Sequence, residues 1–175
     1  MQTRTISTFE EAYTGVLRKL SQRDYSSQEI IKYLNRRNCS EKIAQAVLKK
    51  LLEHNYIDDR RLCRYICERW QKEGLYGEKM LKIKLFQRGF SKEVIRDVLS
   101  DFDLDEEEKA NKLFLNYLKK IKKFDNKTVE KIVRYLVAKG FSYQTINRII
   151  AANKDTLKDI LKNNYLDTCF KNLYN

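Results

Sequence analysis

Residues Ser26 to Leu62 read SSQEIIKYLNRRNCSEKIAQAVLKKLLEHNYIDDRRL, with apolar side chains recurring at three- and four-residue intervals. This spacing is typical of amphipathic helices that bury one face. The segment divides into two short helices joined by a turn, followed by the start of a third helix at the Asp58–Asp59 pair. Asp58 suits the N-cap of that helix, and Asp59 complements its dipole. The segment therefore predicts a unit built around a helix-turn-helix.

The spacing of this segment returns twice when the chain is shifted along itself by 51 residues. The coincident positions follow L-x-x-x-[NG]-[CF]-S-x-x-x-[AI]-x-x-x-[LI], starting at Leu34, Leu85 and Leu136. A fixed repeat of this length indicates tandem helical units. We predict an all-α fold of three tandem three-helix repeats in an elongated, curved array. The repeats are expected at 1–57, 58–104 and 105–153, and a C-terminal helical tail at 154–175.

Two positions of the repeat predict how its helices end and begin. Asparagine and glycine tolerate the positive φ that often ends a helix, and serine is a preferred N-cap. The same turn is therefore expected three times. The helix ends are Asn38, Gly89 and Gly140, and the N-caps are Ser40, Ser91 and Ser142.

The composition also favours helices and argues against a membrane protein. The chain has no proline and 5 glycines, and lysine, glutamate, leucine and arginine abound. No apolar stretch approaches the roughly 20 residues that span a bilayer. The N-terminal residues MQTRTISTFEEAY lack the apolar core of a signal peptide. We expect a cytoplasmic protein whose mature chain begins here, with no membrane association.

The cysteines are expected to be small buried hydrophobes and not disulfides, since cytoplasmic thiols stay reduced. Cys63 and Cys67 are spaced to share one helix face, which makes them a candidate metal pair. A structural zinc needs four ligands, and His54 is the sole histidine. We therefore expect no metal and no cofactor. The four cysteines are Cys39, Cys63, Cys67 and Cys169.

The formal net charge of +12 favours an anionic partner, either nucleic acid or an acidic protein surface. Eleven of the thirteen arginines precede residue 100, which places the expected contact surface on the first two repeats. Arginine binds phosphate and carboxylate in bidentate fashion. The alternative is a solvated face with lysines that cover apolar surface with their stems. The candidate residues are Arg36, Arg37, Arg60, Arg61, Arg64, Arg69, Lys72, Lys79, Lys82, Lys84 and Arg88.

Other motifs have simpler interpretations. Sequence-specific base readout is disfavoured because the helices after the turns carry few side chains suited to base edges. Trp70 lies on an apolar stripe and is expected in the core, whereas Tyr76 in the turn GLYG is more open to stacking on bases. The acidic run 101–108 suits a linker and helix start, with DNA mimicry or a contact to the basic second repeat as alternatives. No P-loop, nucleophile elbow or dinucleotide loop is present, so catalysis is not expected.

These residues together resemble the RecX family of RecA regulators. The specific part starts with R-x-x-S-x-x-E at Arg23 and continues with L-x-x-L-x-x-x-x-Y-I-D-D from Leu48 to Asp59. Tyr65, Arg69, Gly77 and L-x-x-x-G-F from Leu85 to Phe90 complete it. The similarity covers roughly residues 10–150. The chain departs from the family pattern with Asn38 and Asn55 at usual glycines and with Leu62-Cys63 in place of Phe-Ala.

The resemblance implies a non-enzymatic, monomeric protein made of tandem three-helix repeats. Its implied role is to bind in the groove of RecA recombinase filaments on single-stranded DNA and to restrain filament growth, ATP hydrolysis, recombination and coprotease activity. Double-stranded DNA is a further candidate ligand, and stabilisation of the filament is the opposite effect. The alternatives are a stand-alone, sequence-independent DNA-binding protein and an adaptor for an acidic protein.

Charge reversal at Arg60, Arg61 and Arg64 is expected to weaken partner binding and barely change the melting temperature.

Overall fold

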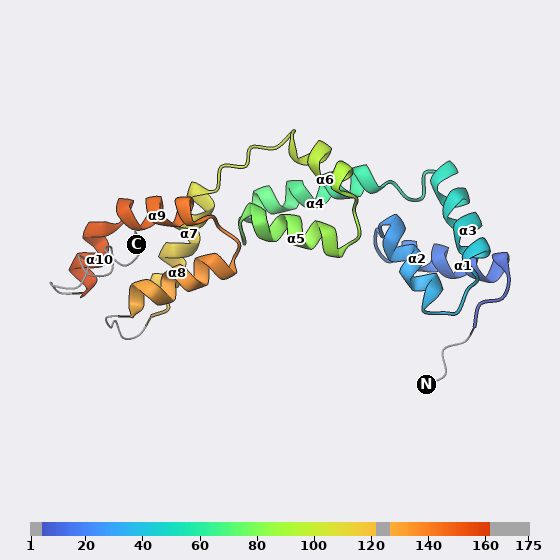
Figure 1. Cartoon of the computed structure of the whole chain (residues 1–175), viewed down its shortest axis with the longest axis horizontal. Coiled ribbons are helices and arrows are strands. Elements are labelled where there is room, and N and C mark those ends of the chain that lie inside the picture. The colour runs from blue at the N-terminus through green and yellow to red at the C-terminus, as the bar shows by residue number, and fades with distance from the viewer. Residues whose placement is uncertain (1–4, 122–126, 162–175) are drawn as a thin grey trace. The chain divides into compact units, whose positions relative to one another are not determined.

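The computed structural model describes residues 5–121 and 127–161, and all regular secondary structure in these residues is helical (Figure 1). The predicted all-α, helical-repeat fold is therefore confirmed. The predicted tail is described as far as α10, while Cys169 lies outside the described residues. The helices are α1 (Phe9–Leu20), α2 (Ser27–Asn35), α3 (Glu41–Glu53), α4 (Asp59–Glu73), α5 (Glu78–Gln87), α6 (Lys92–Leu99), α7 (Glu107–Leu118), α8 (Thr128–Ala138), α9 (Tyr143–Ala152) and α10 (Lys154–Leu161).

The three predicted turns form as the sequence indicates. Asn38, Gly89 and Gly140 have φ of 52°, 87° and 87°. The hydroxyls of Ser40, Ser91 and Ser142 each accept a hydrogen bond from the amide three residues later, at 3.4, 3.2 and 3.1 Å. These caps satisfy amides that a helix leaves unpaired at its start. Asn55, the other asparagine at a family glycine, also has a positive φ of 56°.

The described residues form two compact units, which are considered separately. The first unit contains residues 5–69 and 82–103, and the second contains 70–81 and the described residues of 104–161. The first unit has an apolar core under α1, α2 and α3, with Ile30, Leu34 and Leu51 fully buried. In the second unit α7, α8 and α9 enclose Phe114 and Leu136. The predicted repeat boundaries at 57, 104 and 153 stay a prediction.

Within the first unit, the start of α2 meets the end of α5. The Ser26 hydroxyl donates a hydrogen bond to the carbonyl of Arg88 (2.5 Å), and the Ser27 amide donates to Asp59 Oδ1 (2.8 Å). Gly89 brings its backbone against Gln28. We call these contacts, together with the Glu29–Arg88 pair, the first junction.

Within the second unit, the same arrangement recurs 51 residues later. The Gly77 amide donates to the carbonyl of Lys139 (2.9 Å), and the Glu78 amide donates to Glu106 Oε1. A side-chain Cβ at Gly140 would come within 2.6 Å of Met80 Cβ, so glycine permits this close approach. We call this set the second junction. The repeat therefore includes the contacts of its helix ends as well as its cores.

Candidate partner-binding surfaces

Two of the predicted contact arginines on α4 pair with aspartates, one on α6 and one just after its end. Arg60 Nη2 lies 2.8 Å from Asp97 Oδ2, and Arg64 Nη2 lies 2.5 Å from Asp101 Oδ2. The hydrogen bond to Asp101 raises the pKa of Arg64 above its ordinary value. All four side chains are at least two-fifths exposed, and exposed pairs contribute little stability. Their charges are thus partly balanced within the chain.

Arg88 holds the first junction together. Its Nη2 lies 2.7 Å from Glu29 Oε2 and also donates to the carbonyl of Asp24 (3.0 Å). The carboxylate of Glu29 accepts from the Ser26 amide (2.9 Å), which completes a capping box. Burial raises the pKa of Glu29, but hydrogen bonds from Arg88 and Ser26 and the charges of Arg88 and Arg23 outweigh it and lower the pKa. Arg88 therefore has a structural role.

The other predicted residues are divided between the two units. Lys72 and Lys79 belong to the second unit, and the others belong to the first. Arg37 is partly buried beside α2. The exposed members are Arg36, Arg61, Arg69, Lys72, Lys79, Lys82 and Lys84.

Helix α5 combines basic side chains with exposed apolar ones. Leu81 and Leu85 are fully buried, whereas Ile83 and Phe86 are 41% and 57% exposed. The apolar residues therefore occupy two sides of the helix, and the lysines at 82 and 84 flank the exposed one. The sequence predicted the alternation of basic and apolar residues on this helix but not which apolar residues face outward.

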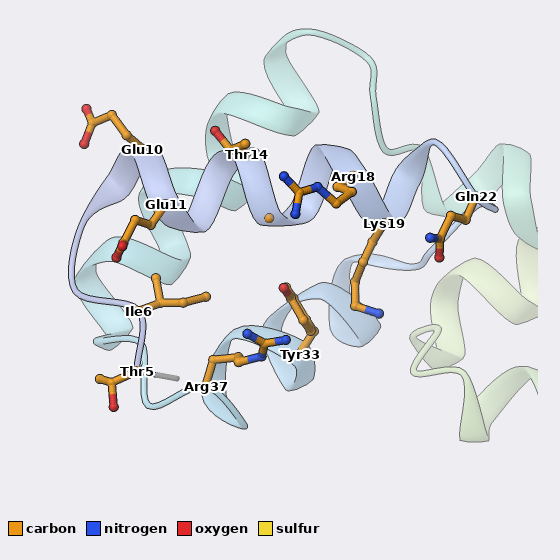
Figure 2. Close-up of a pocket in the computed structure, with 11 residues that line it drawn as sticks. Thr5, Ile6, Glu10, Glu11, Thr14, Arg18, Lys19, Gln22, Tyr33 and Arg37 are labelled. Carbon is orange, nitrogen blue, oxygen red and sulfur yellow. The ribbon is translucent and has the colours of Figure 1, made fainter. Parts of the chain in front are cut away.

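The first unit has a groove between α1 and α2 with a volume of about 600 Å³ (Figure 2). Its basic side chains are Arg18 and Lys19 from α1 and Arg37 beyond the end of α2. In Figure 2, Lys19, Tyr33 and Arg37 extend into the space between the helices, while Glu10 points away. Only Arg37 of this set was among the predicted contact residues.

Cations and tyrosines alternate along this groove and past its end. Arg37 and Lys19 lie over the Tyr33 ring at 5.5 and 4.7 Å from its centre. Lys19 also lies 5.2 Å from the centre of the Tyr25 ring, and Arg23 lies 3.7 Å from it. We call Arg37, Tyr33, Lys19, Tyr25 and Arg23 the cation–aromatic row. The sequence signal for it was weak, since its members come from two helices, the loop between them and the turn after α2.

A smaller pocket of about 160 Å³ lies in the first unit between the α1–α2 loop and the start of α4. Tyr25, Tyr56 and Tyr65 line it together with Arg61. Tyr56 and Tyr65 are 51% and 52% exposed, which sequence patterning did not predict. Tyr25 thus lines this pocket and also belongs to the cation–aromatic row.

The remaining candidates are structural. Trp70 is 1% exposed, as predicted, and its indole N–H donates to the carbonyl of Tyr76 (2.6 Å). Cys39, Cys63 and Cys67 are buried and free, and burial raises the pKa of the Cys39 thiol.

Within residues 5–121 and 127–161, no cluster of metal-ligating side chains is found. Across these residues, no helix has the length and apolarity to cross a bilayer.

Comparison with known families gives matches at both ends of the described region. Residues 12–51 match the family description "RecX, first three-helix domain", and residues 105–150 match "RecX, third three-helix domain". The chain belongs to the RecX family. Each of these RecX domains coincides with one of the two apolar cores, under α1–α3 and α7–α9.

Relatives named regulatory protein RecX agree with this assignment. The protein of Oceanobacillus iheyensis is 27% identical over 154 residues, covering 87% of this chain and 56% of the relative. That of Streptococcus mutans is 31% identical over 143 residues, covering 81% and 55%. The chain thus spans little more than half the length of these relatives. Both relatives are named regulatory protein RecX, so the chain is a member of a regulatory family.

Solved structures show the same fold. A crystal structure of regulatory protein RecX superposes with a TM-score of 0.71 at 26% identity, covering 81% of this chain and 72% of that one. RecX from Lactobacillus salivarius gives a TM-score of 0.67 at 23% identity, over 82% and 95% of the two chains. The second likeness supports the fold alone.

Proposed function

We propose that this chain regulates RecA recombinase by binding RecA filaments on single-stranded DNA. The expected effect is inhibition of filament growth, ATP hydrolysis, recombination and coprotease activity. The observation that supports it most is the match to the first and third RecX domains, in that order along the chain. In this role the protein is a cytoplasmic monomer that needs no cofactor and catalyses no reaction.

The proposed mechanism is bridging between successive subunits of the filament. Tandem repeats present a long surface that can contact more than one copy of a repeating partner. The exposed side of α5 supports this proposal, because Phe86 and Ile83 offer apolar contact beside several lysines. Aromatic residues surrounded by polar ones are common centres of protein interfaces.

The test is a titration of the full chain into RecA assembled on single-stranded DNA, following ATP hydrolysis and strand exchange. Inhibition at amounts stoichiometric with RecA is expected. No change with folded protein would defeat the proposal, and faster or prolonged filament activity would reverse its sign.

A matched pair of variants tests the role of α5. Phe86→Ser removes an aromatic ring that is 57% exposed, and Tyr143→Ser removes one on α9 that is 64% exposed. Loss of an anchor residue typically weakens binding by about tenfold or more. We expect that loss for Phe86→Ser and little change for Tyr143→Ser, with both variants as helical as the parent chain.

The net charge of +12 supports a second candidate, a stand-alone DNA-binding protein. Equal affinity for bare and RecA-coated DNA, with a steep dependence on salt, would favour it. A clear preference for RecA-coated DNA would favour the filament regulator.

A further inference from the structure

The cation–aromatic row differs from an ordinary basic surface because its cations alternate with aromatic rings. Its cations are spaced by tyrosine rings at 3.7 to 5.5 Å, so each charge is held beside an aromatic face. The attraction between a cation and the face of an aromatic ring favours one side-chain arrangement even at exposed sites. The row is therefore partly ordered before any ligand binds.

The surroundings of the row set its charge. Arg18 adds a cation to the α1–α2 groove, and Gln22 adds an amide. Glu10 and Glu11 line the groove near the start of α1, the end at which the Ile6 amide donates to the Arg37 carbonyl, and Glu29 pairs with Arg23 at 3.3 Å. The positive charge of Arg18 and Lys19 thus lies towards the C-terminal end of α1, away from Glu10 and Glu11.

The backbone makes room for this arrangement. A Cβ at Gly15 would lie 3.1 Å from the Tyr33 hydroxyl, so glycine lets the ring lie close against α1. At the other end, the Ile6 amide donates to the carbonyl of Arg37 (3.0 Å), which ties the N-terminal segment across the end of α2. The groove is consequently bounded on both long sides by helices whose positions are fixed by core packing.

We propose that the cation–aromatic row, with Arg18, is a sequence-independent binding track for single-stranded nucleic acid. Proteins that bind single strands combine a basic groove for the phosphates with aromatic or guanidinium faces for the bases. The groove of about 600 Å³ lies in the size range of ligand sites, so it has room for a segment of a single strand. An acidic peptide would use the cations but gain nothing from the alternating rings.

This proposal deepens the function proposed above and takes its biological setting from it, because it supplies a DNA contact for a filament regulator. It also adds residues outside the surface predicted from sequence. Of the row, only Arg37 was expected there, and the other cations are Lys19 and Arg23.

The first experiment measures binding of the full chain to fluorescein-labelled oligothymidylate of about 15 nucleotides, by anisotropy, at several salt concentrations. The variant Lys19→Gln/Arg37→Gln is expected to bind at least tenfold more weakly. Losing two phosphate contacts should reduce the slope of log affinity against log salt by about 1.4.

The control removes the same charge elsewhere in the unit. Lys50 also lies over aromatic rings, at 5.4 Å from Phe9 and 5.0 Å from Tyr13, but it does not line the groove. Lys49→Gln/Lys50→Gln should change affinity by less than about twofold, since only net charge is altered. Equal losses in both double variants, with unchanged circular dichroism, would overturn the proposal.

A second readout locates the strand. Ultraviolet crosslinking of bromodeoxyuridine-substituted oligonucleotide, mapped by mass spectrometry, should modify Tyr25 or Tyr33. Adducts only on other residues would contradict the track. So would a double variant that binds the oligonucleotide normally but loses binding to polyglutamate, since that result assigns the groove to an acidic protein.

RecA ATP hydrolysis separates the two proposals. Normal oligonucleotide binding by the Lys19→Gln/Arg37→Gln variant sinks the track, whatever the filament assay shows. Loss of binding in the variant, together with a parent chain that does not affect RecA, keeps the track and sinks the filament function.

Discussion

The two junctions use equivalent positions with different chemistry. Ser26 and Arg88 of the first junction correspond to Gly77 and Lys139 of the second, at the same offset of 51 residues. In the first, a buried hydroxyl donates to the carbonyl at the end of α5, and in the second a backbone amide donates to the carbonyl at the end of α8. The repeat therefore preserves the acceptor and changes the donor.

The two junctions differ more at the position of the Glu29–Arg88 ion pair. Glu29 and Arg88 form a half-buried ion pair in the first junction, whereas Met80 occupies the position of Glu29 in the second. Met80 packs under Gly140, and Lys139 turns to the Tyr135 ring at 5.5 Å. Both junctions bring a glycine close to a neighbouring helix, and the first adds an ion pair where the second has an apolar side chain. Each should fail under different perturbations.

The largest expected effect is from Gly77→Ala in the second junction. The added Cβ would lie 2.5 Å from the Gly140 oxygen and 2.7 Å from Glu106 Oε1. Because the backbone cannot yield as a long side chain can, we expect a loss of about 2–3 kcal/mol in unfolding free energy. Urea unfolding followed by the fluorescence of Trp70, the sole tryptophan and part of this unit, measures it.

The matched control is Gly15→Ala, where the nearest atom is the hydroxyl of the flexible Tyr33 at 3.1 Å. A comparable loss there would show that an added Cβ costs as much against a flexible side chain, so that the backbone contact of the second junction is not the cause.

A smaller effect is expected at the corresponding position of the first junction. Ser26→Ala removes the N-cap of α2 and the buried hydrogen bond to Arg88. N-cap losses cost typically about 1 kcal/mol, and a buried acceptor left unpaired adds to this, so we expect about 1–2 kcal/mol. Hydrogen exchange of α2 peptides reports it. Ser40→Ala, at an exposed cap, should cost less.

The next effect in size is a difference between the two junctions in their response to low pH. The folded pKa of Glu29 is below its ordinary value of 4.5, so its contribution to stability is present above pH 4.5 and is lost as pH falls through the folded pKa. Protection of α2 in the first unit should therefore drop below pH 4.5, while a Glu29→Gln variant lacks that component of the pH dependence. Identical acid profiles for the parent chain and the variant would refute this.

The smallest effect is expected for the exposed pairs that the arginines of α4 form with Asp97 and Asp101. Arg64→Ala removes a pair whose side chains are 41% and 49% exposed, and such pairs are worth about 0–1 kcal/mol. Thermal melting should shift by no more than a few degrees. A larger shift would mean that this surface pair matters as much as the Glu29–Arg88 pair of the first junction.

Local features of the fold were predictable because they depend on residues close in sequence. Ser40, Ser91 and Ser142 cap helices through an amide three residues away, and the positive φ at Asn38 follows from its own side chain. Trp70 was placed in the core from the apolar stripe of one helix. The family followed from the same local patterns, through the segment from Arg23 to Phe90.

The candidate site was less predictable. Charge alone selected Arg60, Arg64 and Arg88, but their aspartate and glutamate partners lie 37 to 59 residues away. The cation–aromatic row was not predicted because Lys19 and Tyr33 lie on different helices. Sequence spacing gives the face of one helix but not the face of another that it meets.

The sequence by itself determined the helices, their caps and left-handed ends, the repeat of 51 residues and the family, since each is set by side chains within a few turns of one another. Only the tertiary structure decided that Asp59 accepts from Ser27, that Glu29 pairs with Arg88 and that tyrosines alternate with cations along α1 and α2. Those contacts depend on how packed helices bring distant residues together, and that is a property of the folded core.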